Sequence, residues 1–186
     1  MILYLTIIGV AAAIISAVNI ACGTASWYYV LIAVVLCVAL EFAIDGGMAI
    51  LIRLTPDRWY PPFSKHFAVS AWEKKLFLSL KVRLWKDKVW ELGGLGGFSK
   101  SVLREPDDPA YIERFIIECN KGVLTHRLSY PAGFLAMLTL PNVCAWTIAL
   151  PVALVNLYLN ILPTLVLRYN TPMLQGILKR LRRRAK

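Results

Sequence analysis

Two long stretches of the chain lack charged residues. Residues 1–40 contain no Asp, Glu, Lys or Arg, and neither do residues 128–167. One helical crossing of a bilayer needs about 20 apolar residues, so each stretch is long enough for two crossings. The pattern therefore predicts an all-α integral membrane protein with four transmembrane helices.

The remaining residues complete a division into four regions. We expect a transmembrane hairpin over 1–52, a cytoplasmic interfacial region over 53–127, a second transmembrane hairpin over 128–170 and a basic tail over 171–186. Within the second region, residues 70–90 alternate basic and large apolar side chains. This alternation is typical of an amphipathic helix, or of two short ones, lying on a membrane surface between spans two and three.

Charge indicates the orientation. All 21 lysines and arginines lie between the two uncharged stretches or after the second one, and the net charge is +10. Basic segments beside spans stay in the cytoplasm, so both termini are predicted to be cytoplasmic in a multi-pass protein of the cell membrane. Nucleic-acid-binding proteins are also basic, but basic residues next to spans favour membrane lipids with anionic headgroups as the partners. We expect no nucleic-acid partner.

A polar helix leads into the second uncharged stretch. Asp108 is predicted as its N-cap and Pro109 as its first helical residue. Apolar residues then recur with a helical period at Ile112, Phe115, Ile116 and Cys119. The four cysteines of the chain show no paired spacing and are expected to be small core residues, so no metal site is predicted.

Titratable side chains next to a membrane are the candidates for chemistry. Glu118, Gly122 and His126 follow one another at steps of four along one helical face. Glu41 and Asp45 lie one turn apart in the second predicted span, near its cytoplasmic boundary. Intramembrane carboxylates are costly and tend to be functional, which favours an inward orientation. The alternative is that the two acids reach the interface or pair with the basic region.

Two further patterns have open interpretations. Asn156 and Asn160, one turn apart in the last span, either bond to neighbouring helices or line a cavity. The glycine-rich residues 92–100 lack the lysine and hydroxyl ending of a P-loop, so a loop or tight turn is favoured over a nucleotide site. His66 is expected to be structural.

Several short motifs occur in a characteristic order from residue 72 to the tail. They are Trp72-Glu73-Lys74, the run from Val82 to Lys88, Gly96-Gly97-Phe98-Ser99-Lys100, the block from Glu118 to His126, Asn160-Ile161-Leu162-Pro163, Arg168-Tyr169-Asn170 and Pro172-Met173-Leu174. Together they resemble the glycosyl-4,4'-diaponeurosporenoate acyltransferases, which acylate the sugar of staphyloxanthin-type carotenoids. The chain departs from that family at Val123, where the family has a second Glu, and at Arg127, where it has Trp.

The resemblance implies a membrane acyltransferase. It would move a fatty acyl group from a cytoplasmic thioester, acyl-CoA or acyl-carrier protein, to a hydroxyl of a glycosylated or polyol-bearing lipid, with no other cofactor. His126 is the predicted base, because a histidine titrates near working pH, with Glu118, Glu73 or Asp45 as its support. The predicted substrate-binding residues are Trp72, Trp85, Lys86, Lys100, Asn160, Arg168 and Asn170. The alternative is a non-enzymatic lipid carrier or a scaffold subunit.

Overall fold

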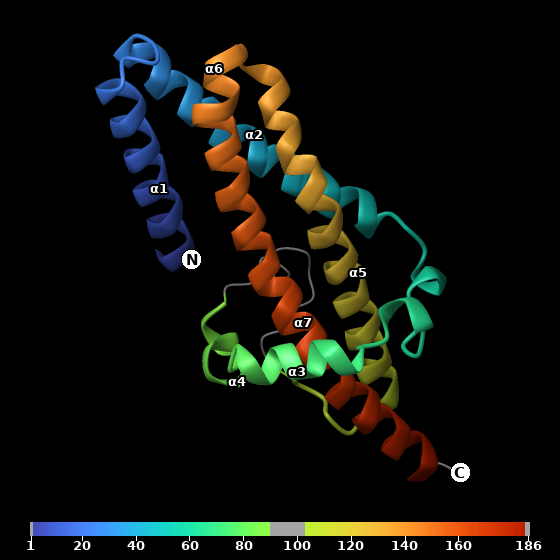
Figure 1. Cartoon of the computed structure of the whole chain (residues 1–186). Helices are drawn as coiled ribbons and strands as arrows, with labels where there is room; N and C mark the ends of the chain where they lie inside the picture. Colours follow the sequence, from blue (N-terminus) through green and yellow to red (C-terminus); the bar gives the residue numbers. More distant parts are fainter. Residues whose placement is uncertain (1, 90–102, 185–186) are drawn as a thin grey trace. The chain divides into compact units, whose positions relative to one another are not determined.

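A computed structural model describes residues 2–89 and 103–184, and every regular element in this part of the chain is a helix (Figure 1). The predicted all-α class is therefore confirmed. The chain divides into two compact units. The first unit comprises Met1–Ile50 and Thr125–Ile161, and the second comprises Leu51–Leu124 and Leu162–Lys186. The glycine-rich residues 92–100 lie outside the described residues.

The described residues contain four long helices, α1, α2, α5 and α7, and several short ones. The first unit contains α1 (Ile2–Ala21), most of α2 (Trp27–Arg53), the C-terminal part of α5 (Pro109–Gly133), η5 (Phe134–Thr139), α6 (Asn142–Cys144), the π-helix η6 (Ala145–Ala149) and the start of α7 (Leu150–Arg184). The second unit contains η1 (Asp57–Trp59), η2 (Lys65–Phe67), α3 (Ala71–Ser79), α4 (Val82–Trp85), η3 (Lys86–Lys88) and the remaining parts of α5 and α7.

Three segments in the described part of the chain are long and apolar enough to cross a membrane: Ile2–Ala21, Trp27–Arg53 and Asn142–Arg184. They support the assignment to membrane proteins. The start of the predicted third span belongs to α5, which also contains the predicted polar helix without a break. Four spans therefore stay a prediction.

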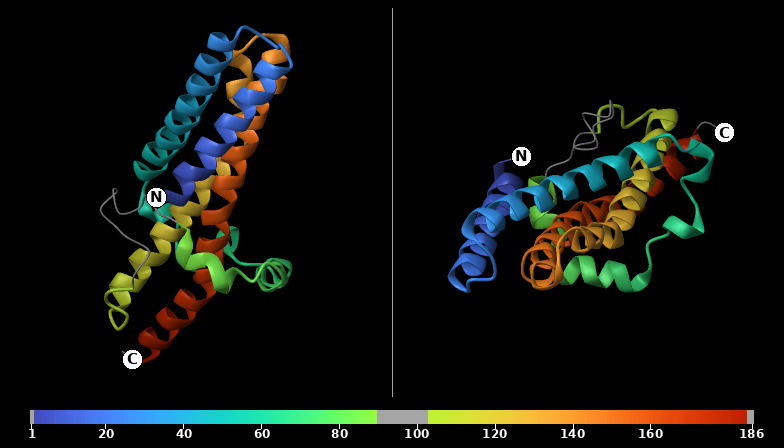
Figure 2. Two further views of the ribbon diagram at one scale, coloured as in Figure 1. Left: turned by 90° about the vertical axis from the view of Figure 1, so that its left-hand side faces the viewer. Right: turned by 90° about the horizontal axis from the view of Figure 1, so that it is seen from above.

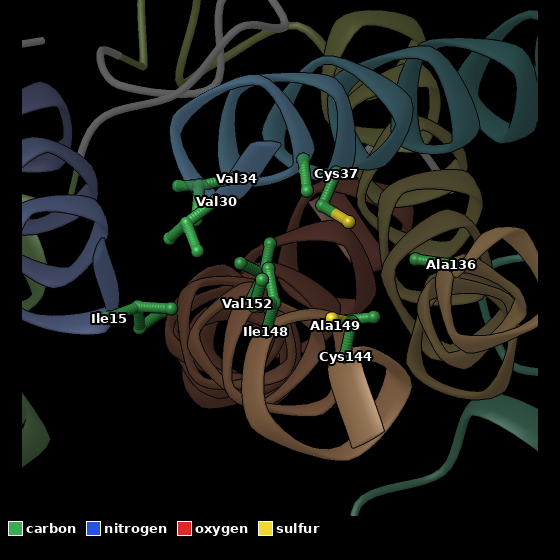
Figure 3. Packing of buried hydrophobic residues seen from close by; sticks show 10 residues of the cluster. Ile15, Val30, Val34, Cys37, Ala136, Cys144, Ile148, Ala149 and Val152 are labelled. Atoms are coloured by element: carbon green, nitrogen blue, oxygen red, sulfur yellow. The ribbon is translucent and has the colours of Figure 1, made fainter. Parts of the chain in front are cut away.

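The core of the first unit joins α1, α2 and the start of α7. Figure 3 shows Ile15 of α1 and Val30 and Val34 of α2 directed towards Ile148 of η6 and Val152 of α7. Val30 and Ile148 are fully buried. The turn between α1 and α2 and the short helix α6 lie at the same end of this unit (Figure 1, Figure 2).

A buried asparagine donates hydrogen bonds across this core. Pro151 has no N–H group to donate to the carbonyl of Thr147, four residues earlier in the helix. Nδ2 of Asn19 donates to that carbonyl at 2.9 Å and to the Ile15 carbonyl at 2.8 Å. The Asn19 side chain thus links α1 to η6 at the place where Pro151 interrupts the backbone ladder.

The second unit is built on the predicted polar helix. Asp108 caps α5 as expected, with its carboxylate accepting from the N–H groups of Ala110 at 2.9 Å and Tyr111 at 3.2 Å. The predicted apolar face is buried and packs against α7 through Leu167, Leu174 and Leu178. Of the cysteines, Cys37, Cys119 and Cys144 are buried as predicted, whereas Cys22 is exposed in the turn after α1, contrary to the prediction.

Residues 70–88 form two short helices, one of the two predicted arrangements. Ser70 caps α3, and Lys81, in the left-handed region at φ 49°, separates α3 from α4. Phe77 and Val82 are buried. The large apolar side chains on the outside of these helices are Trp72, Leu78, Leu80 and Leu84.

We expect Leu178→Ala to destabilise the second unit by about 2–5 kcal/mol, because truncating a buried leucine removes apolar contacts and leaves a cavity. Leu178 is fully buried in the core between α5 and α7. Leu84→Ala is the matched control, since Leu84 is 73% exposed. Equal unfolding midpoints in detergent for the two variants would contradict this packing.

Candidate functional site

Two carboxylates of α2 point into the first unit. Glu41 is only 4% exposed, and its Oε2 accepts a hydrogen bond from Nδ2 of Asn156 at 2.7 Å. The same amide nitrogen lies 3.4 Å from Oδ1 of Asp45. The inward orientation predicted for both acids is confirmed, and Asn156 bonds to a neighbouring helix.

A second asparagine connects Asp45 to His126. Nδ2 of Asn160 donates to Oδ2 of Asp45 at 2.9 Å, and Oδ1 of Asn160 lies 2.7 Å from Nδ1 of His126. The side chains come from α2, α7 and α5, and all three belong to the first unit. Three of the predicted site residues are thus brought together in one hydrogen-bonded row.

The row defines the tautomer of the histidine. A carboxylate only accepts hydrogen bonds, so Asp45 holds the NH₂ group of Asn160 towards itself and leaves the amide oxygen facing His126. An amide oxygen also only accepts, and Nδ1 of His126 therefore carries the hydrogen of this bond. In the neutral ring the lone pair is then on Nε2, the nitrogen that can accept a proton.

Glu41 lies deeper in its helix than the sequence indicated. The helix α2 has 27 residues and ends at Arg53. At 1.5 Å per residue, Asp45 is about 12 Å and Glu41 about 18 Å from that end. Glu41 is therefore near the middle of α2, and the predicted location near one boundary describes Asp45 better.

Gly133 lets the backbone of α5 approach Glu41. A Cβ atom at position 133 would lie 2.7 Å from Oε2 of Glu41 and 3.3 Å from Nδ2 of Asn156. A side chain there would displace the carboxylate from its bond with Asn156. Sequence reasoning missed Gly133, because a glycine inside a helix gives no indication of what packs against it.

Glu118, the first predicted support of His126, occupies another level of the same helix. The helix α5 continues from Pro109 to Gly133, so the eight residues between Glu118 and His126 correspond to about 12 Å along its axis. Asp45 is instead connected to His126 by hydrogen bonds through Asn160. Asp45 was one of the alternative supports for His126 predicted from the sequence.

Glu73 and Arg168 pair with each other in the second unit. Nη2 of Arg168 donates to Oε2 of Glu73 at 2.5 Å, and Nε donates to Oε1. Nη2 also donates to the Ala68 carbonyl at 2.9 Å. Glu73 in turn accepts from the N–H of Ser70 at 2.9 Å as part of the α3 capping box. These bonds fasten α3 to α7 and engage both oxygens of the carboxylate.

Among the described residues, the other predicted substrate-binding side chains form no hydrogen bond with the row Asp45–Asn160–His126 or with the Glu73–Arg168 pair. Nζ of Lys86 pairs with Asp87 at 2.7 Å. Nε1 of Trp85 donates to the Leu80 carbonyl at 2.9 Å, and Trp72 is 68% exposed. Asn170 is half-buried on α7, and Lys100 lies outside the described residues.

An apolar pocket of about 360 Å³ opens beside the Glu73–Arg168 pair in the second unit. Its lining combines α3 with α7 and consists of Lys74, Phe77, Leu78, Tyr169, Pro172 and Met173. The walls are almost entirely hydrocarbon and aromatic, with one lysine among them. Such a surface suits an apolar chain better than a polar ligand.

The hydrogen bond from Arg168, opposed by burial, lowers the pKa of Glu73 from 4.5 to about 2. A folded-state pKa below the ordinary value means that the pair stabilises fully above pH 4.5. This stabilisation is lost as the pH falls from 4.5 towards 2.

We therefore expect Glu73→Gln to lower the free energy of unfolding by about 2 kcal/mol at pH 7, with a smaller difference from the unsubstituted protein at pH 3. Thermal unfolding in detergent at both pH values measures it. Glu113→Gln is the matched control, because the Glu113–Arg182 pair is 40% and 47% exposed and such pairs contribute little. A loss for Glu73→Gln that is independent of pH would count against the ion pair.

Comparison with protein families relates most of the chain to a known family. A family model described as CrtO, glycosyl-4,4'-diaponeurosporenoate acyltransferase, matches residues 56–180. The matched region contains His126, Asn156 and Asn160 and leaves out Glu41 and Asp45. No curated protein and no solved structure matches the chain significantly.

Proposed function

Because the chain belongs to the glycosyl-4,4'-diaponeurosporenoate acyltransferase family and is an acyltransferase, we propose that His126 is its general base. The family name specifies a glycosylated carotenoid as the acceptor. For this chain we propose the broader class of glycosylated or polyol-bearing lipids, with a fatty acyl thioester as the donor. The observation that carries the proposal is the hydrogen-bonded row Asp45–Asn160–His126.

In the proposed reaction, Nε2 of His126 takes the proton of the acceptor hydroxyl as its oxygen attacks the thioester carbonyl carbon. A C–O bond forms, and the C–S bond then breaks. The leaving thiolate takes the proton from Nε2, so the products are an ester and a thiol. Asn160 and Asp45 are positioning residues that hold the proton on Nδ1, and Asp45 stabilises the positive charge that develops on the ring.

The donor is proposed to arrive from the cytoplasm as acyl-CoA or acyl-carrier protein. Basic residues beside the long apolar helices support a cytoplasmic location for both termini and for the region between α2 and α5. The apolar pocket between α3 and α7 offers walls that suit a fatty acyl chain. An enzymatic family also favours this function over the carrier or scaffold alternative.

We expect His126→Ala to reduce acyl transfer at least 100-fold, because a general base contributes about 10²–10⁴-fold to a rate. His66→Ala is the matched control, since His66 is an exposed histidine of the second unit. Transfer by purified protein from acyl-CoA to an alkyl glucoside gives the rates. Equal rates for the two variants would remove His126 from the mechanism.

The orientation is tested by labelling with a membrane-impermeant maleimide. Lys65 is exposed between α2 and α3, and Cys22 is exposed in the turn between α1 and α2. In intact cells we expect the native Cys22 to be labelled. Lys65→Cys, combined with Cys22→Ser, should be labelled only after permeabilisation. The reverse pattern would invert the proposed topology.

A further inference from the structure

Two buried oxygen atoms beside the hydrogen-bonded row Asp45–Asn160–His126 lack a hydrogen-bond partner among the described residues. They are Oε1 of Glu41 and Oγ of Ser129. Glu41 is 4% exposed and Ser129 is 2% exposed. An unpartnered buried polar group costs about 1–3 kcal/mol, and folded proteins retain few of them. A ligand group that bonded to these oxygens would remove that cost.

Both oxygens belong to the surroundings of His126. Ser129 and Gly133 follow His126 by three and seven residues on α5, so the three share one helical face. A Cβ atom added at Gly133 would lie 2.7 Å from Oε2 of Glu41, so the Glu41 carboxylate lies beside Gly133. Gly133 is four residues, or about one helical turn, after Ser129 on α5. The reacting nitrogen and the two unpartnered oxygens thus face the same interior of the first unit.

The polar side chains of this interior form two levels. Glu41 and Asn156 make one level, and Asp45, Asn160 and His126 make the other. Four residues separate the levels on both α2 and α7, which corresponds to about 6 Å. One sugar ring is wide enough to place a hydroxyl at each level at the same time.

We propose that Oε1 of Glu41 and Oγ of Ser129 bind a second hydroxyl of the acceptor sugar while His126 receives the proton of the reacting one. A carboxylate oxygen accepts from a sugar O–H, and a serine hydroxyl donates to a sugar oxygen. This assignment rests on the proposed function and deepens it by naming two residues, Glu41 and Ser129, that recognise the acceptor beside the reacting hydroxyl. Sites built to bond a hydroxyl discriminate strongly against analogues that lack it.

Equilibrium binding tests this subsite without an acyl donor. The full chain in lipid nanodiscs is titrated with dodecyl glucoside and with a series of dodecyl glucosides that each lack one hydroxyl. We expect at least one deoxy analogue to bind about 10-fold more weakly than the parent. Glu41→Gln and Ser129→Ala should each bind the parent more weakly and lose the preference for it over that analogue.

Three further variants test whether the position of the Glu41 carboxylate determines sugar binding. Gly133→Ala should reproduce the effect of Glu41→Gln, because it displaces the carboxylate without removing a polar group. Glu105→Gln and Ser79→Ala, at exposed positions, are the matched controls and should bind like the unsubstituted protein.

Two results would overturn the subsite. One is equal binding of all the glucosides by the unsubstituted protein. The other is a loss in Glu41→Gln by the same factor for the parent and every analogue, which would indicate a purely structural carboxylate. Failure of the proposed function is a separate result, because sugar discrimination without any acyl transfer would leave the subsite standing.

Discussion

Two carboxylates inside a helix that is apolar enough to cross a membrane need hydrogen-bond donors, and two asparagines supply them. Glu41 and Asp45 are four residues apart on α2, and Asn156 and Asn160 are four residues apart on α7, so the pairs meet level by level. An amide donates without bringing a second charge into the interior. The same two amides align α2 with α7, and the second one also orients His126.

The second unit meets a similar demand with a charge instead of an amide. Arg168 engages both oxygens of Glu73 and the carbonyl of Ala68, and the arginine and glutamate side chains are 6% and 17% exposed. A bidentate guanidinium fixes both the position and the angle of its partner. In the first unit neutral amides bond to the carboxylates, whereas in the second unit the arginine engages both oxygens of Glu73 and holds α3 against α7.

Local signals in the sequence predicted local structure well. Asp108 and Pro109 mark the start of α5, and the helical period marks its buried face, because both depend only on neighbours along the chain. The partner of His126 was harder to identify, since a ladder on one helix suggests Glu118 while the actual contact comes from another helix. Gly133 carried no signal at all. Contacts between helices depend on packing, which no single period encodes.

Asn19 ties a region outside the family match to one inside it. Pro151 lies within the matched residues 56–180, whereas Asn19 belongs to the preceding hairpin and donates to the Thr147 carbonyl, to which Pro151 has no N–H to offer. The Asn19 side chain is thus a hydrogen-bonded link between the preceding hairpin and the matched region. A different N-terminal hairpin joined to the matched region would preserve this link only if it placed a hydrogen-bond donor where Asn19 lies.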